Sequence, residues 1–160
     1  MSFSDSSFKY CPDTGRITGA YIIFYQGGPI DHDTYVPVTV AQSSAESGYN
    51  AACTAGMALA HFIMLIRELL NKYPDIVPEE APLVVLDSKS AICMAKSGKD
   101  TKHTRHIARR IYFVRNGEKC KMHKLGWCEV GLKLVDISTK NIGEPDLTPR
   151  MKYIMVRLDN

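Results

Sequence analysis

The chain has 160 residues, 45% of them hydrophobic and 23% charged, with a formal net charge of +3 at pH 7. This composition predicts one globular domain, residues 1–160, with enough apolar residues for a core. It contains no run of about 18 apolar residues and no signal-peptide pattern, so we expect no membrane partner. Its five cysteines lack a Cys-x-x-Cys pair, which is typical of reduced thiols in an intracellular protein, cytoplasmic or nuclear.

Three strands are predicted in the first forty residues. Residues 3–8 alternate in polarity, and residues 20–25 are rich in aromatic and β-branched side chains. A turn signal lies at 11–15, and Gly27-Gly28 offers a tight hairpin turn. A third strand is expected to continue through Tyr35 to Val40.

A long helix is predicted from about residue 44 to residue 72, where apolar residues recur at helical spacing. Ser43 and Glu46 fit a capping box, in which the serine hydroxyl accepts from the Glu46 amide and the glutamate side chain reaches back. Gly48 lies in the second turn, where glycine costs roughly 1 kcal/mol relative to alanine.

The second half of the chain alternates between helices and strands. Residues 83–86 are apolar throughout and precede a helix, which favours a buried, parallel central strand. The further predicted elements are helices at 88–96, 103–116, 132–140 and 146–158 and a strand at 120–127. We therefore expect the α/β class, a mixed sheet layered with helices.

Positive charge gathers between Lys96 and Lys124. This segment holds ten Lys or Arg residues and two acidic ones, a net charge of +8 in a chain whose total is +3. Such a cluster attracts polyanions such as nucleic acid. It is equally compatible with a solvated helix face.

Three aspartates are candidates for a metal site. Asp5 lies on the first predicted strand, Asp87 ends the buried strand, and Asp136 lies on the late short helix. Ligands collect at the carboxyl ends of parallel strands, and carboxylates that converge there need a divalent cation such as Mg²⁺. Spacing alone is weak support, since a single aspartate at a strand end is more often a cap or turn residue.

Ordered motifs around these aspartates are more specific. They are TGAYIIF at 18–24, the Gly27-Gly28 turn, QSSAESGY at 42–49, LDSKSAI at 86–92, TKHTRHI at 101–107 and LVDISTK at 134–140. In this order they resemble the ribonuclease H domain of copia-type retrotransposon polyproteins. The resemblance implies a ribonuclease H-like fold, a five-stranded mixed sheet whose first three strands are antiparallel, flanked by helices. It also implies Mg²⁺- or Mn²⁺-dependent, two-metal hydrolysis of the RNA strand of RNA–DNA hybrids, in a parent polyprotein that carries a reverse transcriptase region.

The resemblance assigns catalytic, metal-binding roles to Asp5, Asp87 and Asp136. The family pattern Ser-Ser-x-Glu-x-Glu-Tyr has a second glutamate before the tyrosine, and Gly48 occupies that place here. Glu46 is two residues away, about 200° around the helix, and its capping role already accounts for it. We therefore expect a weakened second metal site and impaired hydrolysis, with Glu46 kept as the alternative ligand.

Two functions follow from these residues. One is a hybrid nuclease whose activity is impaired, and the other is a catalytically inactive, retrotransposon-derived module that binds nucleic acid or a protein. A protein-interaction role unrelated to nucleic acid also stays open, since fold does not guarantee function. For nucleic-acid contacts the candidates lie on one face of the basic helix and would contact phosphates: Lys102, Arg105, Arg109 and Arg110.

Three other features of the sequence have simpler structural explanations. Asp31-His32-Asp33 could bind a metal, although a solvated turn is the better interpretation. The histidines and cysteines at 103, 106, 120, 123 and 128 do not have the spacing of a common zinc finger. Trp127 is expected in the core.

Overall fold

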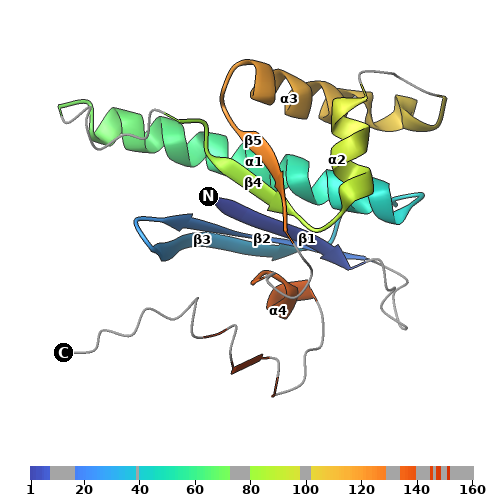
Figure 1. Cartoon of the computed structure of the whole chain (residues 1–160), viewed down its shortest axis with the longest axis horizontal. Coiled ribbons are helices and arrows are strands. Elements are labelled where there is room, and N and C mark those ends of the chain that lie inside the picture. The colour runs from blue at the N-terminus through green and yellow to red at the C-terminus, as the bar shows by residue number, and fades with distance from the viewer. Residues whose placement is uncertain are drawn as a thin grey trace.

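A five-stranded mixed sheet organises the protein. In this computed structural model, residues 1–7, 17–38, 40–72, 80–97, 102–128, 134–139, 145, 147, 148 and 151 are described. The strands are β1 (Ser2–Ser7), β2 (Thr18–Tyr25), β3 (Gly28–Tyr35), β4 (Leu83–Leu86) and β5 (Lys124–Trp127). They lie in the order β3-β2-β1-β4-β5 (Figure 1). The first three are antiparallel and β4 runs parallel to β1 and β5, which confirms the predicted fold class.

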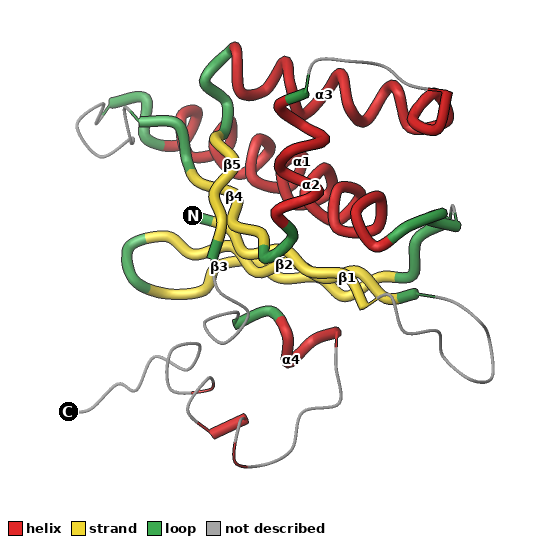
Figure 2. Tube along the Cα trace, turned by 45° about the vertical axis from the view of Figure 1, so that its right-hand side comes forward, coloured by secondary structure: helices red, strands yellow, loops and turns green. Residues whose placement is uncertain are grey.

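Helices cover both faces of the sheet. The helices α1 (Ser44–Leu69), α2 (Lys89–Lys96) and α3 (Ala108–Lys119) lie on one face. The short α4 (Asp136–Thr139) lies on the other (Figure 2). A 3-10 helix, η2 (Lys102–Ile107), leads into α3. The strand β1, which carries the candidate residue Asp5, thus has the layer of α1, α2 and α3 on one side and α4 on the other.

The start of α1 is set by the predicted cap. The Ser43 hydroxyl accepts from the Glu46 amide at 3.1 Å. The Glu46 carboxylate reaches back one residue further than expected and accepts from the backbone N–H of Gln42 at 3.0 Å. The helix therefore begins where the sequence placed it, and one oxygen of Glu46 is used in doing so.

Alternation along β2 separates two apolar layers. Tyr21 and Ile23 pack with α1 and β4, in a buried cluster with Ala52, Ala55, Leu59, Val84 and Leu86. Ala20 and Ile22 point the other way and meet Val135 beside α4. A third buried cluster joins Tyr49 and Cys53 of α1 to residues of α2, η2 and α3, among them Ile107 at the end of η2 and Ile111 of α3. Register therefore decides which face each side chain of β1 and β2 serves.

By length and composition, α1 could cross a membrane, with a hydropathy of 1.4 over its most apolar window. Half of that window is buried inside the fold. The core helix of a soluble protein meets the same criteria, and α1 packs on the sheet as such a helix does.

Several predicted boundaries are corrected. The hairpin turn is Gln26-Gly27, with φ of 51° and 84°, one residue earlier than predicted. The strand β3 ends at Tyr35 rather than Val40, because Pro37 has no N–H for a ladder. The basic helix starts as a 3-10 segment, and α1 ends at Leu69. The 11–15 turn and most of the 146–158 helix lie outside the described residues.

Candidate active site

The strand that carries Asp5 and the short helix that begins at Asp136 are joined through Thr139. Asp5 is 5% exposed, and Asp136, at the start of α4, is 2% exposed. The Thr139 hydroxyl, one turn after Asp136, donates a hydrogen bond to the Asp5 carboxylate. Residues three apart lie on the same face of a helix, so Asp136 shares with Thr139 the face of α4 that is directed toward β1. Thr139 is a site residue that sequence reasoning missed, although it lies inside the LVDISTK motif.

Asp87 lies at the end of the neighbouring strand. Phe3 pairs with Val85 in the parallel ladder between β1 and β4. Asp5 lies two residues further along β1, and Asp87 directly follows the last residue of β4, Leu86, so both lie toward the carboxyl ends of neighbouring parallel strands. The two aspartates thus leave adjacent strands at the same edge of the sheet.

Trp127 is at this edge and not in the core, which corrects the prediction. Its side chain is 45% exposed, because β5 is a four-residue edge strand that ends here. The indole Nε1–H donates to the backbone carbonyl of Asp87 at 3.1 Å, and the Lys89 ammonium lies 4.2 Å from the ring centroid. Its position at the end of a predicted strand was the signal available in the sequence.

Gly48 faces the same edge of the sheet. A Cβ at this position would lie 3.3 Å from the Ser88 Cβ and 3.7 Å from the Ala91 Cβ. Ser88 directly follows Asp87 and caps α2 by accepting from the Ala91 amide at 3.2 Å. A side chain at position 48 would therefore start next to the Asp87 end of β4. The 3.3 Å approach means that Ser88 would have to yield by a few tenths of an ångström.

Glu46 has partners of its own. It is 4% exposed, and besides the Gln42 amide its carboxylate contacts the His106 ring, with 2.8 Å between Oε1 and Nε2. His106 belongs to η2, far along the chain from α1. One oxygen of Glu46 thus caps α1, and the other contacts η2. No local sequence pattern predicted the contact with η2.

The described carboxylates do not fit a complete two-cation site. Within the described parts of the chain, no three His, Cys, Asp or Glu side chains gather closely enough to hold a metal ion. Asp5, Asp87 and Asp136 offer the hard oxygen donors that Mg²⁺ prefers. Gly48 adds no donor, and Glu46 is engaged elsewhere.

The predicted basic surface divides into exposed and structural members. Arg105 and Arg109 are exposed and Arg110 is half-buried, and together with His106 they line an open hollow. Arg115 has a structural role, since its Nε–H donates to the Ala95 carbonyl at 3.0 Å and ties α3 to the end of α2. The Lys102 side chain lies outside the described residues.

The histidines and cysteines that suggested zinc are dispersed where they are described. His106 is bonded to Glu46, His123 is buried between α1 and α3, and Cys120 is exposed. Burial raises the pKa of the Cys53 thiol to about 11, so this cysteine stays protonated in the core. The segment Asp31-His32-Asp33 is not a turn but an exposed stretch of β3, paired with β2.

Comparison with known proteins identifies the fold. No protein-family model and no curated protein matches the sequence. RNase H1 from the halophilic archaeon Halobacterium salinarum NRC-1 is similar, with a TM-score of 0.50, 14% identity, and coverage of 81% of this chain and 83% of that one. LC11-RNase H1 in complex with an RNA/DNA hybrid has a TM-score of 0.50, 12% identity and the same coverage of 81% and 83%. The N-terminal RNase H domain of Rv2228c from Mycobacterium tuberculosis, solved as a fusion with maltose-binding protein, has a TM-score of 0.53 and 7% identity, covering 94% and 96%. At these identities the likeness concerns the fold alone.

Proposed function

We propose that this chain, whose fold is that of RNase H, binds RNA–DNA hybrids and hydrolyses their RNA strand only weakly. The ordered motifs suggest a copia-type retrotransposon origin, in which a reverse transcriptase region would belong to the same polyprotein. The observation that carries the proposal is the contrast between two residues of α1. Gly48 faces the Asp87 end of β4 but has no carboxylate, whereas Glu46 has a carboxylate that is already hydrogen-bonded to Gln42 and His106.

Weak hydrolysis is expected from the oxygen donors that this chain provides. Mg²⁺ or Mn²⁺, where bound, would activate water and stabilise the leaving oxygen. Asp5, Asp87 and Asp136 lie on or beside neighbouring elements at one edge of the sheet. Three carboxylates leave the second of two cations with fewer ligands, so it should be held poorly.

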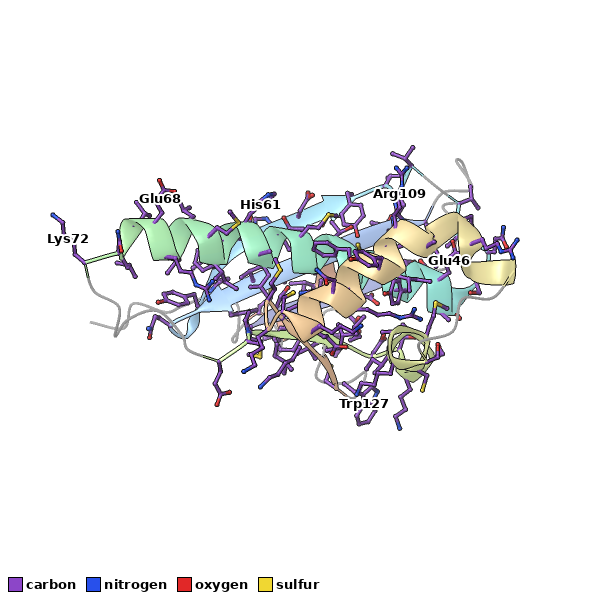
Figure 3. All side chains as sticks on the ribbon, turned by 90° about the horizontal axis from the view of Figure 1, so that it is seen from above. Glu46, His61, Glu68, Lys72, Arg109 and Trp127 are labelled. Atoms are coloured by element: carbon purple, nitrogen blue, oxygen red, sulfur yellow. The ribbon has the colours of Figure 1, made fainter. Side chains whose placement is uncertain are left out.

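Hybrid binding is supported by charge and by likeness of fold. Arg105 of η2 and Arg109 in the first turn of α3 are exposed, and Figure 3 shows Arg109 at the same end of the molecule as Glu46 in the first turn of α1. Cations of this kind hold phosphates without reading sequence. One of the similar structures is bound to an RNA/DNA hybrid. A module that binds nucleic acid or a protein without any turnover is the second candidate, favoured by the same Gly48.

The deciding experiment restores the carboxylate. We expect Gly48→Glu to raise cleavage of a labelled RNA–DNA hybrid in Mg²⁺ or Mn²⁺ by at least about tenfold, since groups that support a metal are worth that much. Gly48→Gln has nearly the same shape without the charge and should stay near the wild-type rate. A second variant, Gly48→Glu with Ser88→Gly, removes the close Ser88 side chain at a capping cost of a few tenths of a kcal/mol.

Trp127 gives an independent measure of binding. It is the only tryptophan of the chain and is bonded to Asp87, so its fluorescence reports on this edge of the sheet. Hybrid titration should change the emission at low salt, and the affinity should fall steeply as salt rises. Strong wild-type cleavage that Glu46→Gln abolishes would overturn the proposal, and so would salt-insensitive binding or none.

A further inference from the structure

We propose that Glu46 is a positioning residue for nucleic-acid binding, which holds the basic η2–α3 segment against the start of α1 through His106. This inference rests on the proposed hybrid binding and assigns to Glu46 a role other than metal ligation. It concerns how the phosphate-contacting arginines are oriented, not how the RNA strand is cut.

The contact joins two segments that lie far apart in the chain. Glu46 is buried in the first turn of α1, where the Gln42 amide holds one carboxylate oxygen at 3.0 Å. The other oxygen lies 2.8 Å from Nε2 of His106, whose side chain is 38% exposed. With one oxygen fixed by backbone, the carboxylate has a defined orientation, and so has the ring that it holds.

The segment held by this contact has little local support. A 3-10 helix such as η2 has poorer hydrogen-bond geometry than an α-helix. The N-cap of α3 is Ile107, which makes no side-chain capping hydrogen bond. Among the side chains of this segment that the structure describes, the buried apolar anchors begin at Ile107: Ile107 and Ile111 are buried, and the Tyr49 hydroxyl donates to the Ile111 carbonyl at 3.3 Å. The Glu46–His106 contact therefore holds the part of the segment that precedes these anchors.

The arginines of the hollow flank this contact. Arg105 precedes His106, and Arg109 follows it within one helical turn. Figure 3 shows Glu46 and Arg109 at one end of α1 and Glu68 at the opposite end. Because η2 is already ordered in the free protein, less conformational entropy is lost at these side chains when a hybrid binds.

Charge alone predicts the opposite effect of removing Glu46. Its carboxylate is a negative charge beside a surface that binds a polyanion, so neutralising it should strengthen binding within a Debye length of about 10 Å. Loss of positioning should weaken binding instead. The sign of the change in affinity thus separates the two roles.

The test measures hybrid affinity and its salt dependence for Glu46→Gln, with Glu68→Gln as the matched control at the exposed far end of α1. We expect Glu46→Gln to weaken binding about three- to tenfold and Glu68→Gln to leave it unchanged or slightly stronger. The slope of log affinity against log salt should stay close to wild type in Glu46→Gln. In Arg109→Ala, which loses a phosphate contact, the slope should fall by about 0.7 to 0.9.

A second variant guards against misfolding. Glutamine at position 46 can still accept from the Gln42 amide, and His106→Gln leaves the Glu46 cap in place. The two substitutions alter the same contact from its two sides, so the double variant should bind no more weakly than the weaker single one. Unchanged or tighter binding by Glu46→Gln, with wild-type binding intact, would overturn the positioning role alone. Failure of the wild-type chain to bind hybrid would remove the proposed function and this role together.

Discussion

The two ends of α1 are built in opposite ways. At the site end, Ser47 and Asn50 are buried, and none of their side-chain polar atoms has a hydrogen-bond partner among the described residues. At the far end, Met64, Leu65 and Leu69 are 63%, 51% and 68% exposed. Packing alone would place polar and apolar residues the other way round. The difference shows that the site end of the helix departs from what stability favours, as expected near a functional site.

The far end carries an apolar hollow of about 300 Å³. It is lined by side chains of β2 and α1, among them Phe24, Tyr25, Phe62 and Ile63, and by Met122. The site end instead has glycine and small polar residues against β1 and α2. One helix thus borders the candidate site at one end and is an amphipathic core element for the rest of its length.

The largest expected effect tests the core element. Leu59 is 2% exposed and packs against the sheet, so Leu59→Ala should cost about 2–5 kcal/mol in the free energy of unfolding. Leu69→Ala, at the exposed end, should change it by less than about 0.5 kcal/mol. Urea denaturation measures both, and equal losses at the two positions would contradict the packing described for α1.

An intermediate effect concerns pH at the middle of the helix. His123 packs against Gly56 of α1, and burial lowers its pKa, outweighing the opposite influence of the Glu118 carboxylate. The folded protein therefore resists protonation of His123, while the unfolded chain takes up the proton near its ordinary pKa of about 6.5. Stability should fall as the pH drops below about 6.5, by at most about 1.4 kcal/mol per pH unit, until the folded pKa is reached.

Unfolding of wild type and variants at about pH 7.5 and pH 5 measures this effect. His123→Leu should reduce the loss between the two pH values, whereas His61→Gln, at an exposed position of α1, should leave it unchanged. An identical acid loss in wild type and His123→Leu would show that other groups account for it.

The smallest expected effect sharpens the comparison at the site end. Ser47→Ala removes a buried hydroxyl that has no partner among the described residues and adds a better helix former. We expect the free energy of unfolding to rise by up to about 1 kcal/mol, measured by thermal or urea denaturation. The control Ser44→Ala, at an exposed position in the first turn, should change it by less than about 0.5 kcal/mol. A clear loss of stability in Ser47→Ala would mean that the hydroxyl makes a favourable contact after all.

Local patterns were sufficient for most of the fold. The Ser43 cap, the apolar run 83–86 and the period-2 pattern of β2 each act within a few residues, and each element formed where it was predicted. Boundaries moved where a neighbouring strand or backbone chemistry intervened, as at Pro37 and at the start of the basic helix. The three aspartates were placed on the correct elements, while their metal-binding role stays a prediction.

By itself, the sequence determined the elements, the mixed sheet and the presence of glycine, which carries no carboxylate, at position 48, because helix and strand periodicity and the order of motifs are properties of the chain. Tertiary structure decided the partners. Thr139 is hydrogen-bonded to Asp5, His106 is hydrogen-bonded to Glu46, and Trp127 lies outside the core and donates to the backbone carbonyl of Asp87. Each of these contacts joins segments at least 40 residues apart, so they depend on how α4, η2 and β5 pack and not on any local pattern.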